Sequence, residues 1–203
     1  MAVRLVAFDL DGTLIREPNA LTVLAHAFEQ PDWIRRMEIL EMRGEDPAAM
    51  RRRVEPWLAI PVDERCRPLA SAVLAPGVGE AFRLLHARGV TTAIVSLSWD
   101  FIVTWFADRF GALHRAGVGL DADGSVTPFW PEDKGPWLQR LAATRGLSRH
   151  EVAAVGDSPR DASLLRAAGH AFYVGRELPS SLADVHHHPD GDLAGVARAI
   201  LAR

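Results

Sequence analysis

The chain has 203 residues, 48% of them hydrophobic, and a formal net charge of −3 at pH 7. That length fits one large domain or a core domain with a modest insertion, and the hydrophobic fraction is ample for a buried core. No apolar run approaches the roughly 20 residues of a membrane span, and the small negative charge gives no reason to expect nucleic acid or an anionic membrane as a partner. A single cysteine, Cys66, excludes an internal disulfide. Because the first residues also lack the order of a signal peptide, we expect a cytoplasmic protein.

Four short, continuous apolar runs recur along the chain. Uninterrupted runs of this length are expected where a parallel sheet is covered by helices on both faces. The runs occupy residues 3–8, 91–96, 151–156 and 171–175. Stretches with helical spacing of apolar residues lie between and after them, at 78–88, 136–145, 161–168 and 192–202. This alternation predicts a doubly wound α/β fold with a parallel, Rossmann-like sheet.

Residues 17–74 interrupt the alternation. They show helical periodicity and no clear strand, and three prolines, at 31, 47 and 61, divide them. We interpret this block as a small all-helical cap domain inserted after the first strand. The core domain then consists of residues 1–16 and 75–203.

Two shorter features lie in the second half of the chain. Residues 117–129 predict a β-hairpin, because they contain an Asp-Gly pair typical of a tight turn. Residues 186–188 are three consecutive histidines. A metal cluster is one interpretation of them, but without cysteines or spaced carboxylates nearby we favour solvated surface at the end of a loop.

Polar side chains follow three of the predicted strands, and the loop after the hairpin brings a lysine toward them. In an open α/β sheet, ligands bind beyond the carboxyl ends of the strands. The residues expected at this edge are Asp9, Asp11, Ser96, Lys134, Asp157 and Asp161. So much negative charge needs a cation, and hard oxygen ligands select Mg²⁺ over softer metals. A serine, a lysine and the metal would together neutralise a phosphoryl group, whose transfer depends mainly on positioning and charge stabilisation.

Each of these motifs also has a purely structural interpretation. Asp-Leu-Asp-Gly-Thr at 9–13 is compatible with an Asx-turn before a helix, and Gly-Asp-Ser-Pro-Arg-Asp at 156–161 with a helix N-cap followed by proline. A lone serine after a strand is most often a cap or turn residue, and a lone lysine before glycine is usually solvated. Their joint order, with each at a strand end or in the loop that feeds the same edge, favours the functional interpretation.

The sequences DLDGT at 9–13, VSLS at 95–98, Lys134 and GDSPRD at 156–161 resemble the four motifs of the haloacid dehalogenase superfamily. The insertion resembles the cap of the phosphoserine phosphatase-like branch. The resemblance implies that Asp9 attacks phosphorus to give an aspartyl-phosphate. It also implies that Asp11 is the general acid for the leaving alcohol and then the base that activates water. A halide needs no proton, so the presence of Asp11 favours phosphoester over carbon–halogen cleavage.

The same resemblance implies a metal site and a phosphate site. Mg²⁺ would be held by Asp9, the backbone carbonyl of Asp11, and Asp157, with Asp161 either a further ligand or a neighbour that orients the ligands. The phosphoryl group would contact Gly12, Thr13, Ser96, Leu97 and Lys134. Among these, Ser96 and Lys134 would bind its oxygens, and Gly12 and Thr13 would let backbone amides approach it.

The substrate is less defined than the reaction. Phosphoserine phosphatases have Ser-Gly-Gly where this chain has residues 96–98, Ser-Leu-Ser, and they have a substrate-reading glutamate where this chain has Pro18. Glu17 is a candidate replacement for that glutamate. Arg43, or one of the arginines at 51–53, is a candidate for the cap arginine that reads the carboxylate of serine.

Aromatic residues near the second and third motifs supply further candidates. Trp99 and Phe101 are predicted either to line an apolar pocket beside the phosphate site or to begin a core helix. Trp130, four residues before Lys134, either borders the site or packs in the core.

We therefore expect a Mg²⁺-dependent phosphomonoesterase that acts on a small phosphorylated metabolite. One alternative is a phosphotransferase, which would pass the phosphoryl group from Asp9 to an alcohol, and another is an enzyme specific for phosphoserine. A non-catalytic binding module is disfavoured, since Asp9, Asp11 and Lys134 are all present. The sequence carries no signal for the oligomeric state.

Overall fold

The computed structural model describes residues 2–29, 46, 48–49, 51–52, 55, 59–121, 124–182 and 184–203. Within these residues seven strands form one sheet, in the order β4-β3-β2-β1-β5-β6-β7. The strands are β1 (Leu5–Phe8), β2 (Thr91–Trp99), β3 (His114–Leu120), β4 (Val126–Thr127), β5 (Val152–Gly156), β6 (His170–Tyr173) and β7 (His186–His187). Every neighbouring pair is parallel except β3 with β4.

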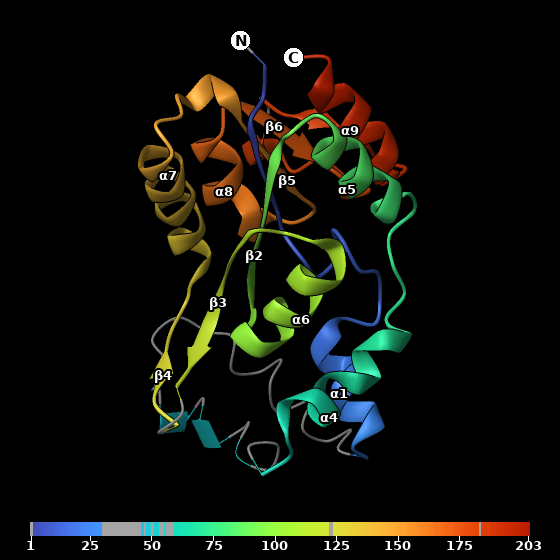
Figure 1. Ribbon diagram of the computed structural model, residues 1–203, viewed down its shortest axis with the longest axis vertical. Coiled ribbons are helices and arrows are strands. Elements are labelled where there is room, and N and C mark those ends of the chain that lie inside the picture. The colour runs from blue at the N-terminus through green and yellow to red at the C-terminus, as the bar shows by residue number, and fades with distance from the viewer. Residues whose placement is uncertain are drawn as a thin grey trace.

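Helices cover both faces of this sheet (Figure 1). The described α-helices are α1 (Ala20–Ala27), α4 (Val62–Cys66), α5 (Val78–Ala87), α6 (Asp100–Phe110), α7 (Lys134–Thr144), α8 (Ala162–Ala167) and α9 (Leu193–Leu201). Short 3₁₀ turns are η1 (Arg67–Ser71), η2 (Pro131–Asp133), η3 (Arg149–Glu151), η4 (Pro159–Asp161) and η5 (Ser180–Leu182). None of the helices in the described part of the chain is long and apolar enough to cross a membrane.

The central strand shows why its apolar run is continuous. β1 lies between β2 and β5, and all four of its residues are buried. Because side chains alternate along a strand, Val6 and Phe8 pack in the hydrophobic cluster that contains α5, α6 and α9. Leu5 and Ala7 point the other way, into the cluster that contains α7 and α8. The predicted doubly wound α/β fold is confirmed.

The described part of the insertion is helical, with α1, α4 and η1 lying beyond the carboxyl ends of the strands (Figure 1). The chain leaves and re-enters the core at one place. The amide of Arg16 donates to the carbonyl of Val73 at 2.7 Å, and that of Ala75 donates to the carbonyl of Leu14 at 2.9 Å. The division into a core domain and a cap domain at 17–74 fits this crossing and stays a prediction.

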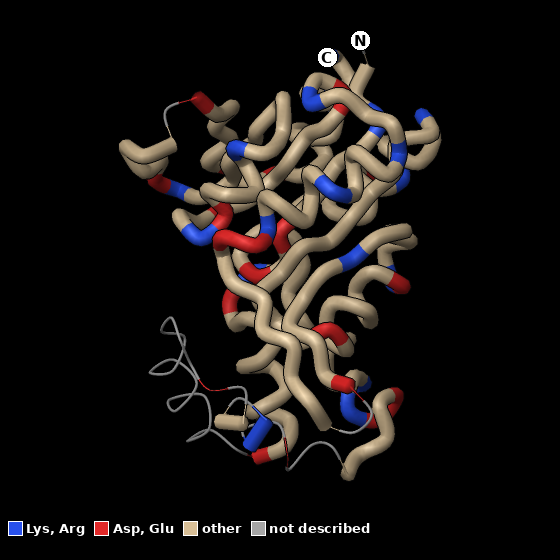
Figure 2. The backbone as a smooth tube through the Cα atoms, turned by 90° about the vertical axis from the view of Figure 1, so that its left-hand side faces the viewer, with Lys and Arg blue, Asp and Glu red and all other residues tan. Residues whose placement is uncertain are grey.

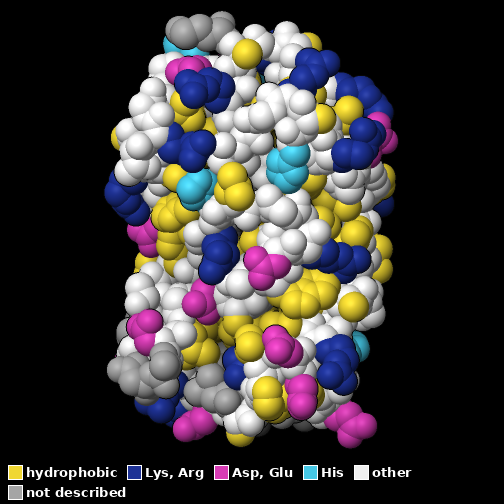
Figure 3. Space-filling view, viewed as in Figure 1, with side chains coloured by type: hydrophobic (Ala, Val, Ile, Leu, Met, Phe, Trp, Pro, Cys, Tyr) yellow, Lys and Arg dark blue, Asp and Glu magenta, His cyan; other side chains and the backbone are white. Residues whose placement is uncertain are grey.

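Charged residues are distributed differently inside and outside the molecule. The backbone view shows acidic positions gathered midway along the long axis, between the sheet and the insertion (Figure 2). On the face seen in Figure 3, basic and acidic side chains are interspersed without a broad patch of one sign. Among the described residues, the buried acidic side chains are those of Asp9 and Asp161.

The hairpin prediction is confirmed, and the strand before it differs from expectation. β3 and β4 pair antiparallel, with Gly119 opposite Thr127. β2 continues to Trp99, past its expected end at Ser96, because its pairing with β3 resumes at Trp99 opposite Val118 after an irregularity. Residues 96–98 therefore lie on an extended, bulged segment rather than in a loop.

The three histidines correct another prediction. His186 and His187 form β7, which pairs parallel with β6 at the edge of the sheet, and their rings contact Phe172 and Tyr173. A ring nitrogen of His187, Nε2, lies 2.8 Å from the carbonyl oxygen of Gly175. The expected loop is an edge strand, because the partners of this short strand are distant in sequence and no local periodicity reveals them. The expected surface position agrees with the exposed His186 and the half-buried His187 and His188.

Candidate active site

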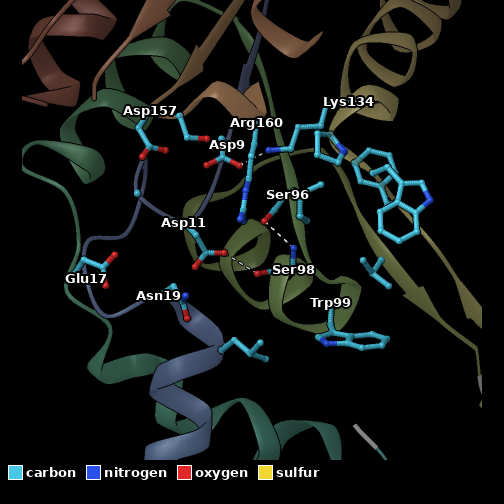
Figure 4. A pocket seen from close by; sticks show the side chains of 18 of the residues that line it. Asp9, Asp11, Glu17, Asn19, Ser96, Ser98, Trp99, Lys134, Asp157 and Arg160 are labelled. Atoms are coloured by element: carbon cyan, nitrogen blue, oxygen red, sulfur yellow. Dashed lines mark hydrogen bonds and ion pairs between the residues drawn. The ribbon is translucent and has the colours of Figure 1, made fainter. Parts of the chain in front are cut away.

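A cavity of about 340 Å³ opens at the carboxyl ends of the central strands (Figure 4). It is lined by Asp9, Asp11, Gly12, Arg16, Glu17, Asn19, Leu21, Ser96, Leu97, Ser98, Trp99, Val118, Phe129, Trp130, Pro131, Lys134, Asp157, Ser158 and Arg160. β1, β2 and β5 are adjacent in the sheet, so the three motifs that follow them converge without any long loop.

Lys134, the only lysine in the sequence, lies at the first position of α7 with an exposed fraction of 1%. Its Nζ donates to Asp9 Oδ1 at 2.6 Å and to Asp161 Oδ1 at 2.7 Å. Burial alone would lower the pKa of this ammonium group, but the two carboxylates outweigh burial and raise it above its ordinary value. Lys134 is therefore a permanent cation at neutral pH.

Three carboxylates surround this lysine. Asp9, Asp157 and Asp161 each offer one oxygen, and the three oxygens lie within 4.8 Å of one another. Burial, with repulsion from Asp161, raises the pKa of Asp9 well above its ordinary value. The same two causes raise the pKa of Asp157 to about 6. One ammonium group cannot balance three carboxylates, and a set of hard oxygen donors left with excess negative charge fits Mg²⁺.

Asp161 is fixed from both sides. While Oδ1 accepts from Lys134, Oδ2 accepts from the backbone amides of Asp157 and Ser158 and from the Ser158 hydroxyl, each at 3.1 Å. A Cβ at Gly156 would lie 2.5 Å from that of Asp161, so only glycine fits there. With both oxygens engaged by the protein, Asp161 is better suited to orient the loop of Asp157 than to bind a cation directly.

Asp11 points away from these three carboxylates. Its Oδ1 accepts from the backbone amide of Ala20, at the start of α1, at 2.8 Å. Its Oδ2 accepts from the hydroxyl of Ser98 on β2 at 2.7 Å, as Figure 4 shows. Two carboxylates that are two residues apart therefore have separate partners. In the sequence, Ser98 belongs to the second motif and departs there from Ser-Gly-Gly. Its link to Asp11 depends on the neighbouring strands and has no local signal.

Gly12 and Thr13 act on Asp157. The Thr13 hydroxyl donates to Asp157 Oδ1 at 3.0 Å, and a Cβ at Gly12, whose φ is 88°, would lie 2.2 Å from Asp157 Oδ2. The amide of Gly12 donates to the carbonyl of Ile15 at 2.8 Å, which differs from its expected approach to a phosphate. The structure thus explains in another way why residue 12 is glycine: the absence of a side chain leaves room for the Asp157 carboxylate.

Two arginines, Arg16 and Arg160, also line the cavity, although neither is among the site residues predicted from the sequence. Arg16 donates to the backbone carbonyls of Gly12 and Gly191, both at 2.9 Å, and so ties the loop after β1 to the segment before α9. Arg160 extends between Asp9 and Ser96 in the view of Figure 4. Its position inside the GDSPRD motif, one residue before Asp161, was an available signal.

The remaining predicted residues have varied outcomes. Ser96, 1% exposed, accepts from the amide of Ser98 at 3.0 Å, and both it and Leu97 line the cavity. Glu17, Trp99 and Trp130 line the cavity too. Phe101 does not; it packs in the core. Arg43 lies outside the described residues.

The model of the haloacid dehalogenase-like hydrolase family matches residues 6–166. Phosphoserine phosphatase from Archaeoglobus fulgidus is 26% identical over 191 residues, which cover 89% of this chain and 55% of that protein. This chain thus spans about half the length of that relative. Phosphoserine phosphatase from Methanocaldococcus jannaschii is 23% identical over 177 residues, with 82% of each chain covered.

Among solved structures, a phospho-aspartyl intermediate analogue of phosphoserine phosphatase superposes with a TM-score of 0.73. It is 22% identical, and the match covers 98% of this chain and 99% of that one. At this identity the similarity shows the fold alone. The two matched chains share that fold from end to end.

Proposed function

This chain belongs to the haloacid dehalogenase-like hydrolases. On that premise we propose that it is a member of the phosphoserine phosphatase-like branch, to which its curated relatives belong, and that it hydrolyses the phosphate ester of a small metabolite with Mg²⁺ as cofactor. One observation carries the proposal. Lys134 is buried between Asp9 and Asp161, and Asp157 lies beside them. A buried cation among several carboxylates is costly to maintain for stability alone, and it suits the charge of a phosphoryl group.

In the proposed reaction an oxygen of Asp9 attacks phosphorus, and the bond from phosphorus to the alcohol oxygen breaks. Asp11 gives its proton to that oxygen, so the alcohol leaves neutral. Water then attacks the aspartyl-phosphate while Asp11 takes its proton, which releases phosphate and restores Asp9. Lys134 holds the nucleophile in place, and Ser96 binds the phosphoryl oxygens.

The geometry supports this division of roles between the two aspartates. Asp9 is 5% exposed and fixed by Lys134, whereas Asp11 is held by Ala20 and Ser98 at the side of the cavity nearer the insertion. Asp9, the backbone carbonyl of Asp11, and Asp157 would hold Mg²⁺, which when bound supplies positive charge to the phosphoryl oxygens. The single cysteine, Cys66, is buried and unpaired, which suits the cytoplasmic setting we propose.

Purified protein incubated with Mg²⁺ and a panel of phosphorylated metabolites, phosphoserine included, tests the proposal through phosphate release. We expect release that a chelator abolishes and that falls at least about 10⁴-fold in Asp9→Asn, the loss typical of a missing nucleophile. Asp108→Asn, a change at an exposed carboxylate on α6, is the matched control and keeps full activity. Full activity in Asp9→Asn, or release by no substrate, contradicts the proposal. Added alcohols that become phosphorylated would favour a transferase.

A further inference from the structure

The cavity has two chemically different ends. Carboxylates and Lys134 occupy the end formed by β1 and β5. The described wall also has seven apolar members, beside polar ones such as Arg16, Glu17 and Asn19. The apolar members are Leu21, Leu97, Trp99, Val118, Phe129, Trp130 and Pro131. We call these seven residues the apolar wall. A mixed cavity of this kind fixes a ligand through a few polar groups and recognises the remainder by apolar contact.

The aromatic members of the apolar wall are held in place by the fold. Trp99 is 4% exposed and lies opposite Val118, also 4% exposed, where β2 and β3 resume pairing. The backbone amide of Trp130 donates to Asp133 Oδ2 at 2.9 Å, in the turn that leads directly into Lys134. Phe129 packs against both hydrophobic clusters. The rings are thus positioned by the same elements that position the charged end.

The described cations of the cavity are committed to its charged end. Lys134 is bound to two carboxylates, and Arg16 donates to two backbone carbonyls. In the view of Figure 4, Arg160 is drawn between Asp9 and Ser96, and Trp99 is drawn farther from it, beyond Ser98. Within the described part of the chain, the wall around Trp99 therefore presents apolar side chains, among which Phe129 and Trp130 are half-buried and Trp99 is nearly covered, and its lining residues there include no lysine or arginine.

We propose that the alcohol part of the substrate carries a flat apolar group, an aromatic or heteroaromatic ring, that packs against Trp99, Phe129 and Trp130. This inference rests on the proposed phosphatase function and names the class of its substrate. A ring in such a site gains from burial of its faces and from aromatic contacts. A zwitterionic amino-acid phosphate would instead lose the hydration of its charged groups against apolar side chains.

Three primary alkyl phosphates with similar leaving groups test the inference: 2-phenylethyl phosphate, ethyl phosphate and phosphoserine. Because all three release a primary alcohol, differences in kcat/KM report contacts with the rest of the molecule and not the ease of bond breaking. We expect kcat/KM for 2-phenylethyl phosphate to exceed that for each of the others by about 30-fold, the value of burying one phenyl ring.

Substitutions test whether the apolar wall causes this preference for the phenyl ester. Trp130→Ala should lower the ratio of kcat/KM for 2-phenylethyl phosphate to that for ethyl phosphate by about 10-fold, and Trp130→Phe should restore most of it. Trp105→Ala removes an indole of intermediate exposure on α6 that does not line the cavity, so it should leave the ratio unchanged. Because the ratio is internal to each variant, partial misfolding does not alter it.

The outcomes distinguish failure of the aromatic substrate class from failure of the proposed phosphatase function. If none of the three esters is hydrolysed but another metabolite of the panel is, the phosphatase stands and the aromatic substrate class is wrong; if no phosphate ester is hydrolysed with Mg²⁺, both proposals fail. If ethyl phosphate or phosphoserine is hydrolysed as well as the phenyl ester or better, the phosphatase stands and the aromatic substrate class is wrong. An equal loss of kcat/KM for all esters in Trp130→Ala also contradicts the inference, because the indole would then support the site without contacting the alcohol part of the substrate.

Discussion

The charged end and the apolar wall of the cavity are built in different ways. At the charged end, side chains follow adjacent buried strands and are fixed by directional bonds, such as Lys134 to Asp9 and Thr13 to Asp157. The apolar wall comes from the ends of β2 and β3, from α1 and from the segment before α7, and its members are held mainly by packing. Removing one partner of a buried ion pair strongly lowers the stability of the protein, because the other charge stays buried without compensation. Apolar contacts, in contrast, tolerate substitutions that preserve volume. In our proposals the first region determines the reaction and the second determines the substrate.

Removal of the central cation should have the largest effect. Lys134→Met leaves Asp9 and Asp161 buried without their partner, which we expect to cost about 3–5 kcal/mol of unfolding free energy. Activity should fall at least about 10³-fold. Denaturant unfolding and phosphate release measure the two losses. Adding Asp161→Asn should recover part of the stability and none of the activity; unchanged stability in Lys134→Met would contradict the description of the charged end.

Loss of the hydroxyl that holds Asp11 should have a smaller effect. Ser98→Ala removes the 2.7 Å bond to Asp11 Oδ2, and a hydrogen bond to a charged group is worth about 1.5–3 kcal/mol. We expect kcat to fall by about 10-fold or more with KM nearly constant, and Ser98→Thr to keep most of the activity. The loss should shrink for substrates with good leaving groups, which need less help from an acid. Equal losses for alkyl and aryl esters would remove this role from Ser98.

The free energy of unfolding should depend on pH because the carboxylates at the charged end are buried and repel one another. Burial, followed by repulsion from Asp161, raises the pKa of Asp157 to about 6, above its unfolded value of about 4. As the pH rises between these values, the unfolded chain loses the proton first, so the folded state without added metal loses stability. Mg²⁺ binds only the ionised group, so its effect on Tm should be larger near about pH 7.5 than near about pH 5.

Calorimetry with and without Mg²⁺ at the two pH values measures this difference. Asp157→Asn should raise the Tm of the metal-free protein near neutral pH and abolish most of the stabilisation by Mg²⁺. A Mg²⁺ effect that is the same at both pH values would show that Asp157 does not take part in binding.

A volume-conserving change in the apolar wall should have the smallest effect. Phe129→Leu keeps an apolar side chain of similar size, and we expect a cost below about 1.5 kcal/mol in unfolding free energy. The rate with ethyl phosphate should change less than about 3-fold, while the preference for the phenyl ester weakens. Losses as large as those in Ser98→Ala would mean that the two regions are not separable.

Much of the charged end was predictable from local sequence. Asp9, Asp157 and Asp161 follow continuous apolar runs, and parallel strands place their carboxyl ends at one edge. The contacts of Ser98 and Arg16 were not predictable in this way. Each joins segments that are distant in sequence, as when Arg16 reaches the carbonyl of Gly191.

The sequence by itself determined the family, the α/β class and the residues of the charged end, because these follow from short-range patterns in strands and the turns after them. Only the tertiary structure decided which side chains complete the cavity. The bulged continuation of β2 carries Ser98 to Asp11 and Trp99 to Val118. The turn before Lys134 brings Trp130 to the same cavity. Such positions depend on strand order and on packing between distant segments, which no local periodicity encodes.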